Sequence, residues 1–155
     1  MILADKPAGI TSFQTLGAIK KVAGTRKVGH AGTLDKFATG LLIVFTGWTT
    51  RLVPWFTGLD KQYIAEIRFG EETDTLDPEG KIVATSGIPS ESEIRQAVAE
   101  LSGTIDQVPP IYSAIHTGGE RAHRLARAGK EVKLASRQVE IYSSELLVFD
   151  SPHAT

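Results

Sequence analysis

The chain has 155 residues, of which 41% are hydrophobic and 23% charged; this suits one globular domain with a sizeable core. It contains no cysteine, which excludes disulfide bonds and thiolate zinc sites and is compatible with the cytoplasmic location that we expect. The net charge of −1 hides a basic first third, because residues 1–51 hold seven lysines and arginines against two acidic residues. Such a segment is either a solvated helix face or the surface that meets a polyanion.

The start of the chain is predicted to form a strand and a helix. Residues 2–5 suit a short strand that ends in the turn 6–9, and Ser12 is expected to cap a helix that runs to about Val22. Four apolar side chains share one face of this helix at helical spacing: Phe13, Leu16, Ile19 and Val22. Gly24 then acts as a stop signal. We expect neither a secretory signal nor a membrane-spanning segment.

A glycine-rich loop is predicted over residues 29–40, before a buried strand. The apolar run 41–45 is too short for most helices and is partly β-branched, which favours the strand. Residues 49–56 suit a short helix that Pro54 interrupts.

A long hairpin and a second helix are predicted next. Polar and apolar residues alternate over 61–69, which indicates a half-buried strand, and a second strand is predicted over 81–84. Ser90 and Glu93 form a capping-box pattern, from which a helix is expected to continue to about Leu101.

The last third is predicted to consist of strands and one basic helix. Strands are expected over 103–107 and 137–149, an extended segment over 111–115, and the helix over 119–128. This order of elements predicts an α+β domain with a mixed, mostly antiparallel sheet flanked by helices.

Asp35 stands out because it lies in the glycine-rich loop, in the stretch GHAGTLDKFATGLL. A carboxylate can act as a nucleophile at a sugar carbon or a polarised ring carbon. Gly29, Gly32 and Gly40 would leave room for a bulky substrate. The alternative is that Asp35 braces a turn, which loop aspartates commonly do, and spacing alone favours this alternative.

The stretch over residues 29–42 resembles the G-H-x-G-x-L-D-x-x-A-T-G-x-L signature of the TruB family of tRNA pseudouridine synthases. Three further stretches resemble family motifs in the same order: ADKPAGITS, DKQYIAEIRFGEETDTLDPEGKI and VPPIYSAIHTGGERAHRLARAG. Four ordered motifs are far more specific than one. The resemblance implies the pseudouridine synthase fold, of which residues 1–155 would be the N-terminal portion of the catalytic domain.

The resemblance also implies the reaction, the isomerisation of a T-loop uridine in tRNA to pseudouridine. Asp35 would be the catalytic nucleophile, and Tyr63 would stack on the uracil and help to remove a ring proton. His30 would contact the T-loop beside Gly29. The reaction needs no cofactor or metal, and we expect a monomer that binds the tRNA T-arm and no membrane. The alternative function is a catalytically incomplete RNA-binding or tRNA-folding module.

Other candidate site residues carry less specific expectations. Lys6 is expected to contact phosphate, and so is the basic group Lys20, Lys21, Arg26 and Lys27. For Lys20 and Lys21, helix solvation explains the charge equally well. The resemblance implies that Asp77 supports the active site. The acids of its loop have the wrong offsets for an EF-hand calcium site, so no metal is expected there. Arg121 shares a helix face with Arg124 and Arg127 that either touches RNA or is solvated.

The sequence departs from the family pattern in three places. Lys36 and Phe37 stand where the family usually has proline and leucine, and His116 stands where many relatives have lysine. Family members also continue into a C-S-x-G-T-Y-I-R strand, whose arginine pairs with the catalytic aspartate, and then into a small RNA-binding domain. We expect both to be absent from this chain.

Overall fold

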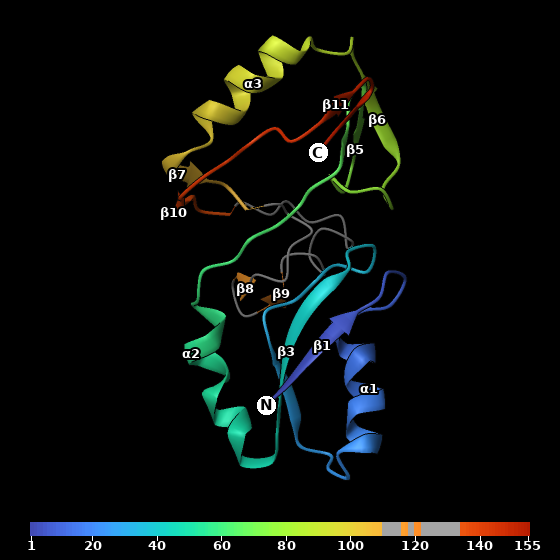
Figure 1. The fold of residues 1–155 in the computed structure, drawn as a ribbon, viewed down its shortest axis with the longest axis vertical. Coiled ribbons are helices and arrows are strands. Elements are labelled where there is room, and N and C mark those ends of the chain that lie inside the picture. Colours follow the sequence, from blue (N-terminus) through green and yellow to red (C-terminus); the bar gives the residue numbers. More distant parts are fainter. Residues whose placement is uncertain (110–115, 118–119, 122–133) are drawn as a thin grey trace. The chain divides into compact units, whose positions relative to one another are not determined.

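The computed structural model describes residues 1–109 and 134–155, together with the backbone of residues 116–117 and 120–121. These residues form two compact units, Met1–Tyr63 and Ile64–Thr155. Every strand pairing described is antiparallel. Helices and antiparallel strands therefore mix as the α+β prediction requires (Figure 1).

A three-stranded sheet forms the centre of unit 1. It consists of β1 (Ile2–Lys6), β2 (Val28–Ala31) and β3 (Gly40–Thr46), in the order β1-β3-β2. Leu3 pairs with Ile43 on one side of β3. The loop predicted over 29–40 therefore begins as a strand, because its first residues find a partner in β3.

Helix α1 (Ser12–Val22) covers one face of this sheet, as Figure 1 shows. The buried residues Leu16, Leu42 and Val44 form the core between them. The prediction that Ser12 caps the helix is wrong. Thr11 is the cap, because its hydroxyl accepts from the Gln14 N–H (3.2 Å) and the Gln14 side chain accepts from the Thr11 N–H (2.8 Å).

The face predicted for α1 is only partly buried. Leu16 is buried and Ile19 packs against the core, whereas Phe13 and Val22 are exposed. With 3.6 residues per turn, positions nine residues apart point to opposite sides of a helix, so Phe13 and Val22 cannot both face the sheet.

The other face of the sheet is covered by the 3-10 helix η1 (Gly47–Leu52) and helix α2 (Val53–Thr57). Pro54 lies in the first turn of α2, where a missing N–H costs nothing, so it begins this helix and does not interrupt it. Side chains alternate along β3, so Phe45 points away from Val44 and toward α2. Its ring meets that of Phe56 edge-on, with the centroids 5.0 Å apart.

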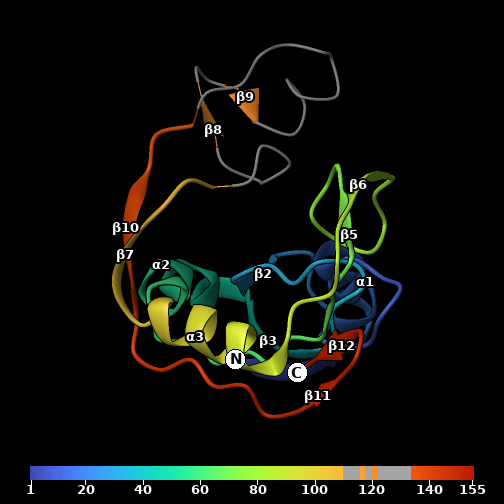
Figure 2. The same ribbon diagram turned by 90° about the horizontal axis from the view of Figure 1, so that it is seen from above.

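Unit 2 contains one helix, α3 (Glu91–Glu100), and several short strands within the described residues. The strands are β4 (Ile67–Arg68), β5 (Glu71–Thr73), β6 (Ile82–Thr85), β7 (Gly103–Gln107), β8 (His116–Thr117), β9 (Glu120–Arg121), β10 (Arg137–Ile141), β11 (Phe149–Asp150) and β12 (His153–Ala154). They form the sheets β11-β12-β4, β5-β6, β10-β7 and β8-β9. Figure 2 shows the β5-β6 hairpin from a second side. Ile94, Leu146 and Ala154 make a small buried core.

Several predictions of strands and helices differ from unit 2. Only β4 forms within the predicted strand 61–69. Its partner is β12, which comes near the C-terminal end of the chain, and the two strands pair over two residues only. The predicted strand 137–149 is kept at its two ends, as β10 and the start of β11. The segment 111–115 and most of the helix predicted over 119–128 lie outside the described residues, although two residues of that range form β9.

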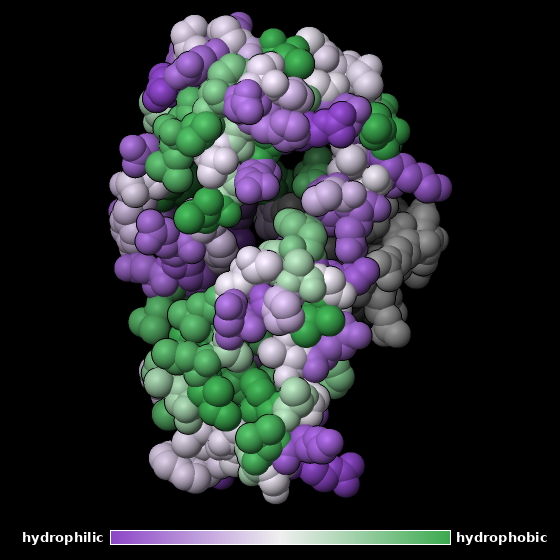
Figure 3. All heavy atoms as spheres, turned by 45° about the vertical axis from the view of Figure 1, so that its right-hand side comes forward, coloured by the Kyte–Doolittle hydropathy of each residue, from purple (hydrophilic) through white to green (hydrophobic). Residues whose placement is uncertain are grey.

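The surface of the described residues carries many apolar side chains, among them Met1, Leu3 and Leu41. Figure 3 shows hydrophobic areas on the face that it presents. No helix in the described part of the chain is long and apolar enough to cross a bilayer.

The capping box predicted for α3 is confirmed, and it yields a test of stability. The Ser90 hydroxyl and backbone N–H both donate to Glu93 Oε2, at 2.7 and 2.8 Å. The hydroxyl bond, followed by the backbone bond, lowers the pKa of the Glu93 carboxyl. A folded-state pKa below the unfolded value gives stability that is present above the unfolded pKa and is lost as pH falls through the folded pKa.

We therefore expect Ser90→Ala to lower the free energy of unfolding by about 1 kcal/mol at neutral pH. The loss of stability on acidification should also become smaller, because the Glu93 pKa moves back up. Urea unfolding at several pH values measures both effects. Ser102→Ala, the same change just beyond the other end of α3, is the control, and equal destabilisation by the two changes would contradict the role of the cap.

Candidate active site

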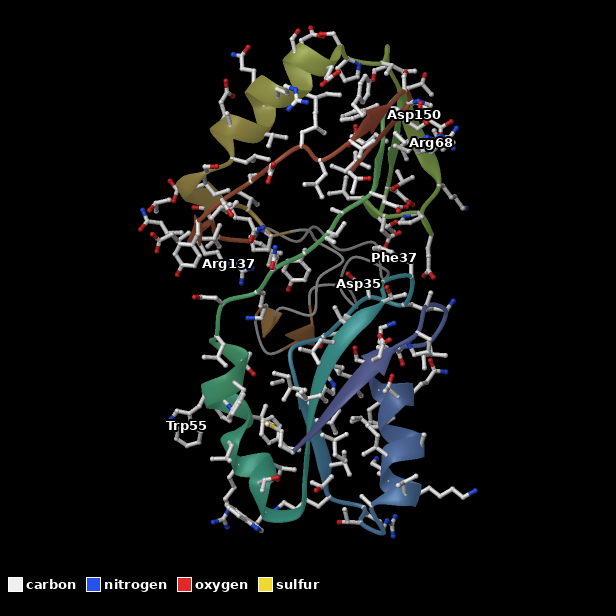
Figure 4. All side chains as sticks on the ribbon, in the orientation of Figure 1. Asp35, Phe37, Trp55, Arg68, Arg137 and Asp150 are labelled. Carbon is white, nitrogen blue, oxygen red and sulfur yellow. The ribbon has the colours of Figure 1, made fainter. Side chains whose placement is uncertain are left out.

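The loop that carries Asp35 connects β2 to β3 at one end of the unit 1 sheet, where Figure 4 labels it. Gly32 and Gly40 lie at its two ends with φ of +82° and +118°, in the left-handed region where a β-carbon is strained. These two glycines let the chain leave β2 and enter β3. The Asp35 side chain is exposed.

Lys6 holds the loop from the C-terminal side of Asp35. Its side chain is completely buried. The ammonium group donates hydrogen bonds to the carbonyl oxygens of Pro7 (3.0 Å), Ile10 (2.8 Å) and Lys36 (3.5 Å). The Gly9 N–H donates to the same Lys36 oxygen at 2.8 Å.

The expected contact between Lys6 and phosphate does not fit this position. A buried ammonium group whose hydrogen bonds go to backbone carbonyls is not presented to a ligand at the surface. Burial and the three carbonyl acceptors make Lys6 a positioning residue for the loop.

Ser12 holds the loop from the N-terminal side of Asp35. Its hydroxyl donates to the Leu34 carbonyl at 3.0 Å and accepts from the Leu34 N–H at 2.9 Å. Both neighbours of Asp35 in the chain are thus fixed through their backbone atoms. Among the described residues, none makes a hydrogen bond or ion pair with the Asp35 carboxylate. The result is a rigid backbone that presents an uncommitted carboxylate.

His30 lies in β2, opposite Val44 of β3, a few residues before Asp35. Its Nδ1 contacts the Gly32 carbonyl oxygen. A carbonyl oxygen can only accept, so Nδ1 carries the proton in this contact. This contact leaves Nε2 for another partner. Gly29 is also in β2, and a β-carbon there would make only ordinary contacts with Val53 and Thr50.

Tyr63 is exposed and lies at the last position of unit 1, outside any strand. The sequence pattern placed it on a half-buried strand. The residues around it form no ladder with another strand, and this leaves the ring accessible.

Asp77 belongs to unit 2, where it braces the loop between β5 and β6. Its Oδ1 accepts from the Thr75 hydroxyl (2.7 Å) and from the Glu79 N–H (2.9 Å). Its backbone N–H and carbonyl both bond to the Thr73 hydroxyl. These contacts give Asp77 a structural role within its own loop. The side chain of Arg121 lies outside the described residues, and the described part of the chain holds no cluster of acids and histidines suited to a metal ion.

Ser12 is the site residue whose role the sequence analysis missed. The stretch TSFQ contains a capping-box pattern beginning at Thr11, which was the available signal that the Ser12 hydroxyl was free for another partner. The partner itself, Leu34, lies 22 residues away in the chain and has no local signature.

The position of Lys6 predicts that Lys6→Met destabilises the protein. The carbonyl oxygens that it satisfies would be left without this donor, at a cost of about 1–3 kcal/mol. Urea unfolding measures the loss, and the Gly9 amide should exchange faster with deuterium because its acceptor, the Lys36 carbonyl, is no longer held. Lys21→Met, on the exposed side of α1, is the control. Equal stability of the two variants would contradict the role of Lys6.

Comparison with known proteins identifies relatives of the whole chain. The model of the "TruB family pseudouridylate synthase (N terminal domain)" matches residues 20–155. A protein of Borreliella burgdorferi named tRNA pseudouridine synthase B is 48% identical over 150 residues, which are 96% of this chain and 53% of the relative. A protein of the same name from Mycobacterium sp. is 50% identical and covers 95% of this chain and 50% of the relative. The chain spans about half the length of these curated relatives.

Two solved structures are also similar to the chain. One is an H/ACA RNP bound to a substrate RNA containing 2′-deoxyuridine, with a TM-score of 0.64 and 25% identity over 97% of this chain and 34% of the other. The second is a Cbf5-Nop10-Gar1 complex, with a TM-score of 0.60, 26% identity and coverage of 97% and 36%. The family match covers most of the residues, including the Asp35 loop and its flanking strands, and the chain therefore belongs to the TruB family of pseudouridylate synthases.

Proposed function

We propose that this chain supplies the nucleophile of a tRNA pseudouridine synthase that isomerises a T-loop uridine. The observation that carries the proposal is the Asp35 carboxylate, exposed on a loop whose backbone Ser12 and Lys6 fix on both sides. Relatives at 46–50% identity are named tRNA pseudouridine synthase B. We further propose that residues 1–155 are the N-terminal portion of the catalytic domain.

The proposed reaction requires a nucleophile, and its product is an isomer of the substrate. The bond between the sugar carbon and uracil nitrogen breaks, the ring turns, and a bond from the same sugar carbon to ring carbon 5 replaces it. The hydrogen on carbon 5 leaves as a proton, and the freed nitrogen gains one. Asp35 attacks either the sugar or the uracil ring in this scheme. A fixed backbone keeps the carboxylate aimed without reorganisation during the reaction.

The target nucleotide must leave the stack before Asp35 can reach it, which costs a few kcal/mol. We propose that His30 contacts the T-loop beside the vacated position. Its Nδ1 contacts the Gly32 carbonyl oxygen, so Nε2 is the ring nitrogen that can hydrogen-bond to RNA. We propose that the exposed Tyr63 ring stacks on the uracil and takes part in removing the proton.

The proposed partner is the T-arm of tRNA, bound by a monomer. Two exposed cationic side chains of unit 1, Lys21 and Arg26, are available for phosphate contacts, which add affinity without reading sequence.

The test is release of tritium from tRNA transcript labelled at uridine carbon 5. We expect release with the unaltered chain and a fall of about 10⁴-fold or more with Asp35→Asn, since removal of a nucleophile has effects of that order. Asp106→Asn, an exposed aspartate of β7, is the matched control and should leave release unchanged.

Two outcomes would contradict the proposed reaction. Equal release by Asp35→Asn would show that Asp35 is not the nucleophile. Retention of tRNA in a binding assay with no release by the unaltered chain would indicate the alternative function, a catalytically incomplete RNA-binding or tRNA-folding module.

A further inference from the structure

Both tryptophans of the chain are exposed side chains of unit 1, in the consecutive helices η1 and α2. Trp48 is in η1 and Trp55 in α2, and their exposed fractions are 73% and 70%. The chain has no other tryptophan. Tryptophan side chains are seldom left in water to this extent, and exposed ones together indicate a binding surface.

The outward direction of these side chains follows from how α2 packs on the sheet. Phe56 meets the buried Phe45 ring, and Val53 is half-buried on the same side of the helix. This fixes the inner face of α2, so Trp55 is turned outward, and Figure 4 shows it pointing away from the sheet. The exposure of Trp55 therefore follows from the way α2 packs on the sheet.

Positive charge accompanies the two rings. Side chains three residues apart eclipse one another in a 3-10 helix, which places Arg51 on the same side of η1 as Trp48. The Gly47 N–H donates to the Lys27 carbonyl at 2.8 Å, so the exposed Lys27 adjoins the start of η1. From Gly47 to Leu59 there is no acidic residue. We call this surface, made by Trp48, Arg51, Trp55 and Lys27, the aromatic-basic surface.

We propose that the aromatic-basic surface binds unpaired nucleotides of an RNA, outside the site that holds the target uridine. Bases stack on exposed aromatic rings, and arginine and lysine neutralise the phosphates between them. We prefer RNA to a second copy of the chain because the positive charge of Arg51 and Lys27 complements the phosphates. A second copy of the chain would bring the same cations face to face, because a two-fold interface pairs identical surfaces. The inference extends the proposed function, since it assumes that the substrate is RNA.

Intrinsic fluorescence gives a direct test, because all tryptophan emission comes from this surface. We expect a single-stranded oligouridylate to quench the emission and a fully paired RNA duplex of the same length to quench it far less. Quenching should weaken as salt is raised. The same titration with Asp35→Asn should be unchanged, which separates this surface from the proposed active site.

Variants test the contribution of each ring. By anisotropy of a labelled oligouridylate, Trp48→Ala and Trp55→Ala should each weaken binding by about tenfold, while Trp55→Phe should restore most of the loss. Tyr142→Ala removes an equally exposed ring from unit 2 and is the control. Because these side chains are exposed, the variants should unfold at the same urea concentration as the unaltered chain.

Two results would overturn the inference. Tryptophan emission that stays constant while the labelled RNA binds would show that RNA does not reach the surface. An emission change on concentrating the protein without RNA, together with a dimer mass in ultracentrifugation, would show a self-interface. Tritium release is measured separately, so the two proposals can fail independently. Tritium release without quenching would contradict only RNA binding at the aromatic-basic surface. Quenching without tritium release would contradict only the proposed reaction.

Discussion

The buried ammonium group of Lys6 joins the turn after β1 to the loop that carries Asp35, and the proposed chemistry depends on this junction. Among the described residues no carboxylate pairs with it, so carbonyl oxygens alone compensate its charge. Burying an ammonium group costs several kcal/mol unless its protons are satisfied. The arrangement is therefore stable only when turn and loop supply all the acceptors together, and the two segments should form and unfold as one piece.

The hydrogen bonds at this junction hold the backbone on both sides of Asp35 and leave the Asp35 side chain exposed. Leu34 and Lys36 are held by backbone atoms, and the residue between them keeps an exposed carboxylate without a partner among the described residues. A nucleophile needs that combination, because positional freedom lowers the rate while a strong partner would occupy the attacking oxygen. The loop of Asp77 shows the opposite use of aspartate. There the carboxylate accepts hydrogen bonds from Thr75 and Glu79 and stabilises the loop between β5 and β6.

The helices on the two faces of the unit 1 sheet have different relations to solvent. Helix α1 contributes Leu16 to the core and presents lysines outward, as expected for an amphipathic helix. The segment formed by η1 and α2 contributes Phe56 inward and presents tryptophans outward. The second arrangement leaves apolar area in water, and a ligand that combines flat bases with phosphates would cover both the rings and the nearby cations.

Local patterns were sufficient for the elements whose stabilising contacts lie close in sequence. The α3 capping box, strand β7 and the apolar strand β3 appear where they were predicted, because caps and short apolar runs act over a few residues. Family motifs likewise identified the loop of Asp35. Only the tertiary structure decided the roles of Lys6 and Ser12, because the loop residues that they hold, Lys36 and Leu34, lie 30 and 22 residues away in the chain. Whether a lysine meets phosphate or carbonyl oxygen depends on burial, and burial is a property of the packed chain.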